Sequence, residues 1–166
     1  MNDRIEHTIP PVYDAGSRIL ILGTMPSPKS RELGFYYAHP QNRFWPVMAA
    51  LFGRPQPRGR DEKTKFLLET RIALWDVLES CTIDGADDSS IKNPAVNDFS
   101  PIFQKADIRR VFTTGKKATG LYRKYCLPKT GRPSVYLPST SPANRGRYPL
   151  EALVRAYAVI LNDLKP

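Results

Sequence analysis

The chain has 166 residues, of which 41% are hydrophobic, and its 25 Lys and Arg outnumber 16 Asp and Glu to give a formal net charge of +9. This length fits one domain over residues 1–166 with a single sizeable core, and no run approaches the ~18 apolar residues of a membrane span. The positive charge favours nucleic acid over a membrane as partner, with a basic solubility surface as the alternative. Because the N-terminus lacks the pattern of a secretory signal, we expect a cytoplasmic protein.

The cysteine and histidine content argues against a metal centre. Cys81 and Cys126 are too few for a four-cysteine zinc or iron–sulfur site, and in the cytosol they are expected to stay reduced. His39 has no second histidine nearby, since His7 is expected to lie in an N-terminal tail. We therefore expect neither a metal nor another cofactor.

Strands and helices alternate along the chain. Arg18 to Gly23 is an apolar run closed by glycine, which is typical of a buried parallel strand. Apolar residues at helical spacing follow from Asn42, and Gly53 ends that helix. The expected elements are a strand at 18–23, helices at 42–52 and 61–69, a strand at 72–77, a short helix at 98–106, a strand at 109–114, a helix at 116–125, a strand at 134–137 and a helix at 151–164. This alternation predicts an α/β fold with a parallel sheet of four strands.

Three long loops are expected at 24–39, 78–97 and 138–149, and each follows a predicted strand. Loops of this length in a compact domain are usually functional. Because the carboxyl ends of parallel strands meet at one edge of the sheet, the three loops should gather where open α/β proteins bind their ligands.

The segment from Tyr37 to Trp45 combines three aromatic residues with His39, Asn42 and Arg43. This mixture suits a pocket for a flat, polar, aromatic ligand, with rings that stack on its faces and polar groups that bind its edge. His39 is either an acid–base group or a structural hydrogen-bonding residue.

The other loops have weaker signals. Gly23 to Pro28 form a stiff turn in which glycine lets the backbone approach a ligand. Ser139 to Arg145 have hydroxyl groups, an amide and a cation, which suit a phosphate grip or a wedge, although a solvated turn is the alternative. Lys116 begins a helix that either binds an anion or is merely solvated. Asp76 is a candidate general base or a loop brace, and Asp98 a candidate base or, preferably, a helix cap.

Taken together, these loops resemble the uracil-DNA glycosylase superfamily and most closely its sixth family, the hypoxanthine (deoxyinosine) DNA glycosylases. The resemblance extends over roughly residues 18 to 147, and its two most specific motifs are 34–45 and 137–144. Weaker matching motifs lie at 23–28, 74–77, 91–93, 97–99 and 115–118. The resemblance implies a three-layer α/β/α sandwich around a four-stranded parallel sheet, formed by a single domain.

The resemblance also implies roles for individual residues. The superfamily's first motif usually supplies a water-activating Asp or Asn just before its proline, but that position here is Met25. In the sixth family the catalytic carboxamide is displaced to the position of Asn42, and Tyr37 resembles the residue that stacks on the flipped base. The implied base-binding residues are Tyr37, Thr24, Met25, Phe35, His39 and Asn97. The implied DNA-binding residues are Ser27, Lys116, Ser139, Ser141, Pro142, Ala143, Asn144 and Arg145.

The expected activity is that of a monofunctional DNA glycosylase of base excision repair, which hydrolyses the N-glycosidic bond of a deaminated base, foremost hypoxanthine. The expected partner is double-stranded DNA, with single-stranded DNA as an alternative, bound by a monomer that is nucleoid-associated if bacterial. Three alternatives remain at this point: a uracil- or mismatch-specific glycosylase, a catalytically inactive DNA-damage-binding protein, and an enzyme that acts on free nucleotides.

Overall fold

The computed structural model describes residues 4–144 and 146–166. Its centre is a parallel sheet with the strand order β3-β2-β6-β7. The strands are β2 (Ile19–Gly23), β3 (Ile72–Asp76), β6 (Arg110–Thr114) and β7 (Ser134–Leu137). All three neighbouring pairs are parallel, which confirms the predicted four-stranded parallel sheet.

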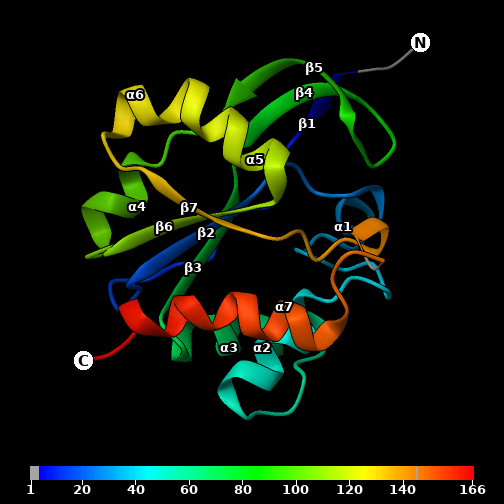
Figure 1. Cartoon of the computed structure of the whole chain (residues 1–166). Coiled ribbons are helices and arrows are strands. Elements are labelled where there is room, and N and C mark those ends of the chain that lie inside the picture. Colours follow the sequence, from blue (N-terminus) through cyan, green and yellow to red (C-terminus); the bar gives the residue numbers. More distant parts are fainter. Residues whose placement is uncertain (1–3, 145) are drawn as a thin grey trace.

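Helices cover both faces of this sheet (Figure 1). One layer contains α2 (Phe44–Phe52), α3 (Gly59–Glu69) and α7 (Leu150–Tyr157), and the other contains α4 (Ser100–Lys105), α5 (Gly115–Leu121) and α6 (Leu127–Thr130). Side chains of a strand alternate between its faces, so Ile19 and Ile21 pack towards α2 and α7 while Leu20 and Leu22 pack towards α4 and α5. This division of the core confirms the three-layer α/β/α architecture.

A second, antiparallel sheet with the order β1-β4-β5 corrects the predicted irregular loop at 78–97. Its strands are β1 (Arg4–Glu6), β4 (Leu78–Asp84) and β5 (Asp87–Val96). Half of the β5 residues are exposed, and the β4–β5 pairing is interrupted by register shifts. Its sequence therefore lacks the regular apolar alternation by which a strand is recognised. Residues 4–6 of the expected N-terminal tail form strand β1 of this sheet.

Smaller differences occur at helix ends and within loops. A short helix, α1 (Pro28–Leu33), lies inside the predicted loop 24–39 and is capped by the Ser27 hydroxyl, which accepts a hydrogen bond from the Ser30 N–H. The predicted helix at 116–125 continues from α5 into a π-helical turn, η1 (Tyr122–Cys126), and the last helix ends in a 3-10 segment, η3 (Ala158–Asp163). Another 3-10 turn, η2 (Pro142–Asn144), lies in the loop after β7. No helix of the described residues is both long and apolar enough to cross a membrane.

Candidate active site

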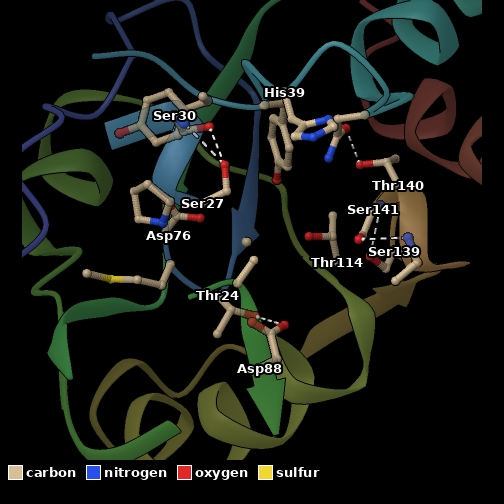
Figure 2. Close-up of a pocket in the computed structure, with 18 of the residues that line it drawn as sticks. Thr24, Ser27, Ser30, His39, Asp76, Asp88, Thr114, Ser139, Thr140 and Ser141 are labelled. Atoms are coloured by element: carbon tan, nitrogen blue, oxygen red, sulfur yellow. Dashed lines mark hydrogen bonds between the residues drawn. The ribbon is translucent and has the colours of Figure 1, made fainter. Parts of the chain in front are cut away.

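A pocket of about 340 Å³ lies at the carboxyl edge of the central sheet, where the loops were expected to meet (Figure 2). Gly23, Asp76 and Thr114, at the ends of three of its strands, form part of its lining. Of the residues singled out in the sequence, the pocket is lined by Thr24, Met25, Ser27, Tyr37, His39, Asn42, Ser139, Ser141, Pro142 and Ala143. The fold thus brings all three sequence-distant loops to one cavity.

Position 23 requires glycine because the backbone there passes close to the side chains of Asp76 and Tyr37. A Cβ atom at this position would lie 2.5 Å from Asp76 Oδ1 and 3.0 Å from the Tyr37 hydroxyl. Neither distance is compatible with a side chain unless the pocket rearranges. The glycine therefore lets the end of β2 pass beside two polar side chains that line the cavity.

Tyr37 is held by its neighbours in a defined orientation. Its backbone is left-handed, with φ of 52°, and its ring stacks on Phe44 at a centroid distance of 4.1 Å and an interplanar angle of 15°. Burial and, secondarily, the Asp76 carboxylate raise the pKa of Tyr37, although the Thr114 hydroxyl lowers it. Because Phe44 covers one face of the ring, the opposite face is the one that a ligand in the pocket can contact.

Asn42 is fixed through its side-chain oxygen. Asn42 Oδ1 accepts hydrogen bonds from the Phe44 backbone N–H and the Thr140 hydroxyl, both at 2.9 Å. A backbone N–H can donate only to the oxygen of a carboxamide, so these contacts also fix which side of the amide is which. With both acceptor sites of the oxygen occupied, the –NH₂ group is the part that can hold a ligand or water.

His39 shapes the turn that leads to Asn42. Its Nδ1 accepts the Gln41 backbone N–H at 3.0 Å, and its carbonyl accepts the Asn42 N–H at 2.9 Å. The ring is exposed at the pocket's edge. In the neutral ring Nε2 therefore carries the proton and can donate to a ligand.

Asp76, which lines the pocket, is hydrogen-bonded to the buried side chain of His7, a contact that no sequence pattern indicated. His7 Nε2 lies 2.9 Å from Asp76 Oδ2, with only 1% and 5% of the two side chains exposed. His7 Nδ1 accepts the Ile9 N–H at 3.3 Å, so Nε2 carries the hydrogen that is donated to Asp76. The expectation that His7 lies in a tail was wrong, because β1 leads it to the end of β3.

Asp88 is a second carboxylate of the pocket that was missed in the sequence. It lies in the β4–β5 hairpin, and its Oδ2 accepts a hydrogen bond of 3.4 Å from the Thr24 hydroxyl (Figure 2). Burial raises the pKa of Asp88, and this effect is partly offset by the Thr24 hydrogen bond and by Lys117. A stretch as polar as 84–90 resembles an ordinary solvated turn, so only the fold could place this group beside Thr24.

The family model of the uracil DNA glycosylase superfamily matches residues 10–165. The chain belongs to this superfamily. It is 36% identical to a hypoxanthine DNA glycosylase of Methanosarcina acetivorans over 143 residues, which is 85% of this chain and 89% of the relative. A hypoxanthine DNA glycosylase of Methanosarcina barkeri is 35% identical over 82% of this chain and 86% of its own length.

A solved structure supports the same membership. The solution structure of a candidate uracil DNA glycosylase from Methanosarcina acetivorans superposes with a TM-score of 0.75 at 33% identity, covering 92% of this chain and 96% of that one. The superfamily fold therefore extends over nearly the whole chain, and the three loops of the pocket lie within the matched region.

The loop after β7 is braced by hydrogen bonds within it in this superfamily member. The Ser139 hydroxyl accepts the Ser141 N–H at 3.1 Å, the Ser141 hydroxyl accepts the Ala143 N–H at 3.2 Å, and Asn144 Nδ2 donates to the Ser139 carbonyl at 2.9 Å. Arg43, which is buried, donates to the carbonyls of Ser141 and Tyr148. Arg145 lies outside the described residues.

Four of the expected site residues lie elsewhere. Phe35 is buried in the core and packs on Tyr36 and Trp45. Asn97 is also buried, and its amide donates to the carbonyls of Asp76 and Leu78. Neither lines the pocket, so both support its walls from behind. Lys116 and Asn144 instead line a neighbouring groove of about 750 Å³, together with Arg123, Tyr136 and Arg147.

Asp98 lies outside the candidate active site and is therefore not placed to act as its general base. It lies at a different surface hollow, next to α4. Its carboxylate accepts the Ser100 N–H at 3.0 Å, and this hydrogen bond lowers the pKa of Asp98. The N-cap of α4 is Phe99 rather than Asp98, so the expected capping role is replaced by a local turn just before the helix. Among the described residues no group of three or more metal-binding side chains occurs.

Proposed function

We propose that the protein is a monofunctional DNA glycosylase that hydrolyses the N-glycosidic bond of deoxyinosine in DNA and releases hypoxanthine. The observation that carries this proposal is the fixed Asn42 carboxamide facing the same pocket as the Tyr37 ring. Membership of the superfamily and the two relatives named hypoxanthine DNA glycosylases support it. We further propose that it acts as a cytoplasmic, nucleoid-associated monomer without a cofactor.

The substrate must reach the pocket as a flipped nucleotide, because a stacked base is inaccessible to an enclosed site. Flipping costs a few kcal/mol, which the braced loop after β7 offsets by entering the duplex. Cationic Lys116, Arg123 and Arg147 border the groove beside the pocket. These side chains would bind flanking phosphates.

The flipped base stacks on the free face of Tyr37, and Asn42 positions the attacking water. The Asn42 –NH₂ group donates a hydrogen bond to one lone pair of the water, so that the other lone pair can face the sugar carbon. Neither Asn42 nor Met25 can remove a proton at neutral pH. The rate must therefore come from positioning and from stabilising the departing base.

The hydrogen-bonding edge of hypoxanthine explains how the site would select it over adenine. The backbone amides of Thr24 and Met25 are the proposed donors to O6. Adenine has an exocyclic amine at that place, which would confront a donor with a donor, and a buried mismatch of this kind is strongly rejected.

The proposal is tested with duplexes that contain one deoxyinosine, deoxyuridine or deoxyxanthosine. Alkali after incubation cleaves each abasic site, and an undamaged duplex is the control. We expect the fastest scission at deoxyinosine. Faster scission at deoxyuridine would favour a uracil glycosylase, and tight binding to the inosine duplex without scission at any base would favour an inactive damage-binding protein.

A further inference from the structure

An acidic hairpin tip reaches the pocket of an otherwise basic chain. The adjoining ends of β4 and β5 carry Asp84, Asp87 and Asp88 in a protein with a formal net charge of +9. Ile83, Gly85, Ala86 and Asp88 of this hairpin line the pocket. A DNA-binding edge has no electrostatic need for such a tip, because negative charge repels phosphates.

The tip presents one of its carboxyl groups to the side of the pocket where the base is proposed to bind. Asp88 as a residue is exposed, yet its carboxyl group is turned inward and accepts the Thr24 hydroxyl hydrogen at 3.4 Å. Figure 2 shows this pair well separated from Thr140, to which Asn42 is hydrogen-bonded. A carboxyl group and a water-holding amide thus lie on different sides of the cavity.

The release of a purine base suggests a role for a carboxyl group at this position. When the N-glycosidic bond of deoxyinosine breaks, its electron pair moves into the purine ring system, and a proton at N7 lets hypoxanthine leave as a neutral molecule. General acid catalysis of this kind contributes about 10²–10⁴-fold to a rate. The Asn42 carboxamide cannot supply such a proton, since it is not an acid at neutral pH.

We propose that Asp88 is a catalytic general acid that protonates N7 of the flipped hypoxanthine as the N-glycosidic bond breaks. This role rests on the proposed function. The Asp88 proton passes to N7, the bond electrons remain with the base, and the water held by Asn42 forms the new bond to the sugar carbon and releases a proton to solvent. Solvent then reprotonates Asp88, so the net reaction consumes one water and yields hypoxanthine and an abasic site.

The surroundings of Asp88 are consistent with a proton-carrying carboxyl group. Burial raises its pKa, and the carboxylates of Asp76 and Asp87 raise it further, while Thr24 and Lys117 lower it. A raised pKa keeps the acid form populated to higher pH. Because the acid form is the active one, the single-turnover rate should fall as the pH rises through this pKa.

The test combines a variant with a substrate that lacks the acceptor atom. Single-turnover rates are measured on duplexes with deoxyinosine or 7-deaza-deoxyinosine, for the wild type and for Asp88→Asn. On deoxyinosine we expect Asp88→Asn to lose about 10²-fold. On the 7-deaza substrate, which has no N7 to protonate, Asp88→Asn should match the wild type. Asp84→Asn removes the same charge from the same hairpin, at a residue that does not line the pocket, and should react with both substrates like the wild type.

The outcomes separate this role from the proposed function. Equal losses on the two substrates would overturn the acid role, because they would show that Asp88 acts independently of N7. A wild type that releases no hypoxanthine would instead overturn the proposed function itself. As a second readout, the fall of the deoxyinosine rate with rising pH should disappear in Asp88→Asn, and its persistence would assign the acid to another group.

Discussion

Asn42 serves both the local fold and the proposed chemistry. Its oxygen accepts hydrogen bonds from the Phe44 N–H at the start of α2 and from the Thr140 hydroxyl, while its –NH₂ group remains for the water. Asn42→Ala should therefore lower the single-turnover rate on deoxyinosine at least about tenfold, since positioning is worth that or more. It should also lower the free energy of unfolding by about 1 kcal/mol through the lost hydrogen bonds of its oxygen.

A matched variant separates these two effects. Asn42→Asp keeps an oxygen for the Phe44 N–H and the Thr140 hydroxyl, so its urea-unfolding midpoint should stay close to that of the wild type. A rate on deoxyinosine that is unchanged in Asn42→Ala would contradict the role of Asn42 as the water-holder.

The sequence could indicate Tyr37 and Asn42, because they lie in one short segment whose mixture of aromatic and polar residues is unusual for a plain loop. It could not indicate the His7–Asp76 pair or the Thr24–Asp88 contact. Their partners are 69 and 64 positions apart, and neither segment of a pair indicates its partner. Such pairs become visible only when the strands bring them together.

Among the elements, β1 is linked to the central sheet through the buried side chain of His7. His7 follows β1 directly and donates to Asp76 at the end of β3. His7→Ala would leave the buried Asp76 carboxylate without this donor and should lower the free energy of unfolding by about 2 kcal/mol. The fluorescence of Trp75, whose ring lies 6.2 Å from that of His7, can report the unfolding in urea.

His7→Gln is the control for this contact, because it retains an N–H donor on a longer side chain and should lose less stability than His7→Ala. Equal unfolding midpoints for the wild type and His7→Ala would show that the pair contributes nothing to holding β1.

The elements also show where sequence patterns succeed. β2 was predicted because both of its faces are buried, which gives a continuous apolar run. The hairpin of β4 and β5 escaped prediction because Pro94 and exposed polar residues interrupt β5, and the bulged pairing shifts which residues face inward. α1 escaped because six residues with an initial proline give too few helical turns for a periodic pattern.

For the whole molecule, the positive charge should appear as a salt-dependent affinity for DNA. Each phosphate neutralised by the protein contributes about 0.9 to the slope of log affinity against log salt concentration. Lys116→Ala, in the groove beside the pocket, should therefore remove one phosphate contact and make this slope about 0.9 shallower. Fluorescence anisotropy of a labelled inosine duplex at several salt concentrations measures it.

Lys65→Ala is the matched control, because it removes the same charge from an exposed position on α3, in the helical layer on the opposite face of the sheet from α5 (Figure 1). It should leave the slope close to that of the wild type. Equal slopes for all three proteins would place the DNA outside this groove.

The architecture itself was predictable because alternating strands and helices admit few topologies. The orientation of DNA on the protein was not, because it depends on surface charges whose positions in space cannot be deduced from their order in the sequence.

The most direct test of the proposed function is the detection of free hypoxanthine. A duplex with one deoxyinosine is incubated with the wild-type protein, and the released base is identified and quantified by mass spectrometry. The proposed mechanism predicts one hypoxanthine for each abasic site, with no adenine released from the matched undamaged duplex. An inosine duplex that stays intact, or that is cut while the base remains attached to its sugar, would contradict it.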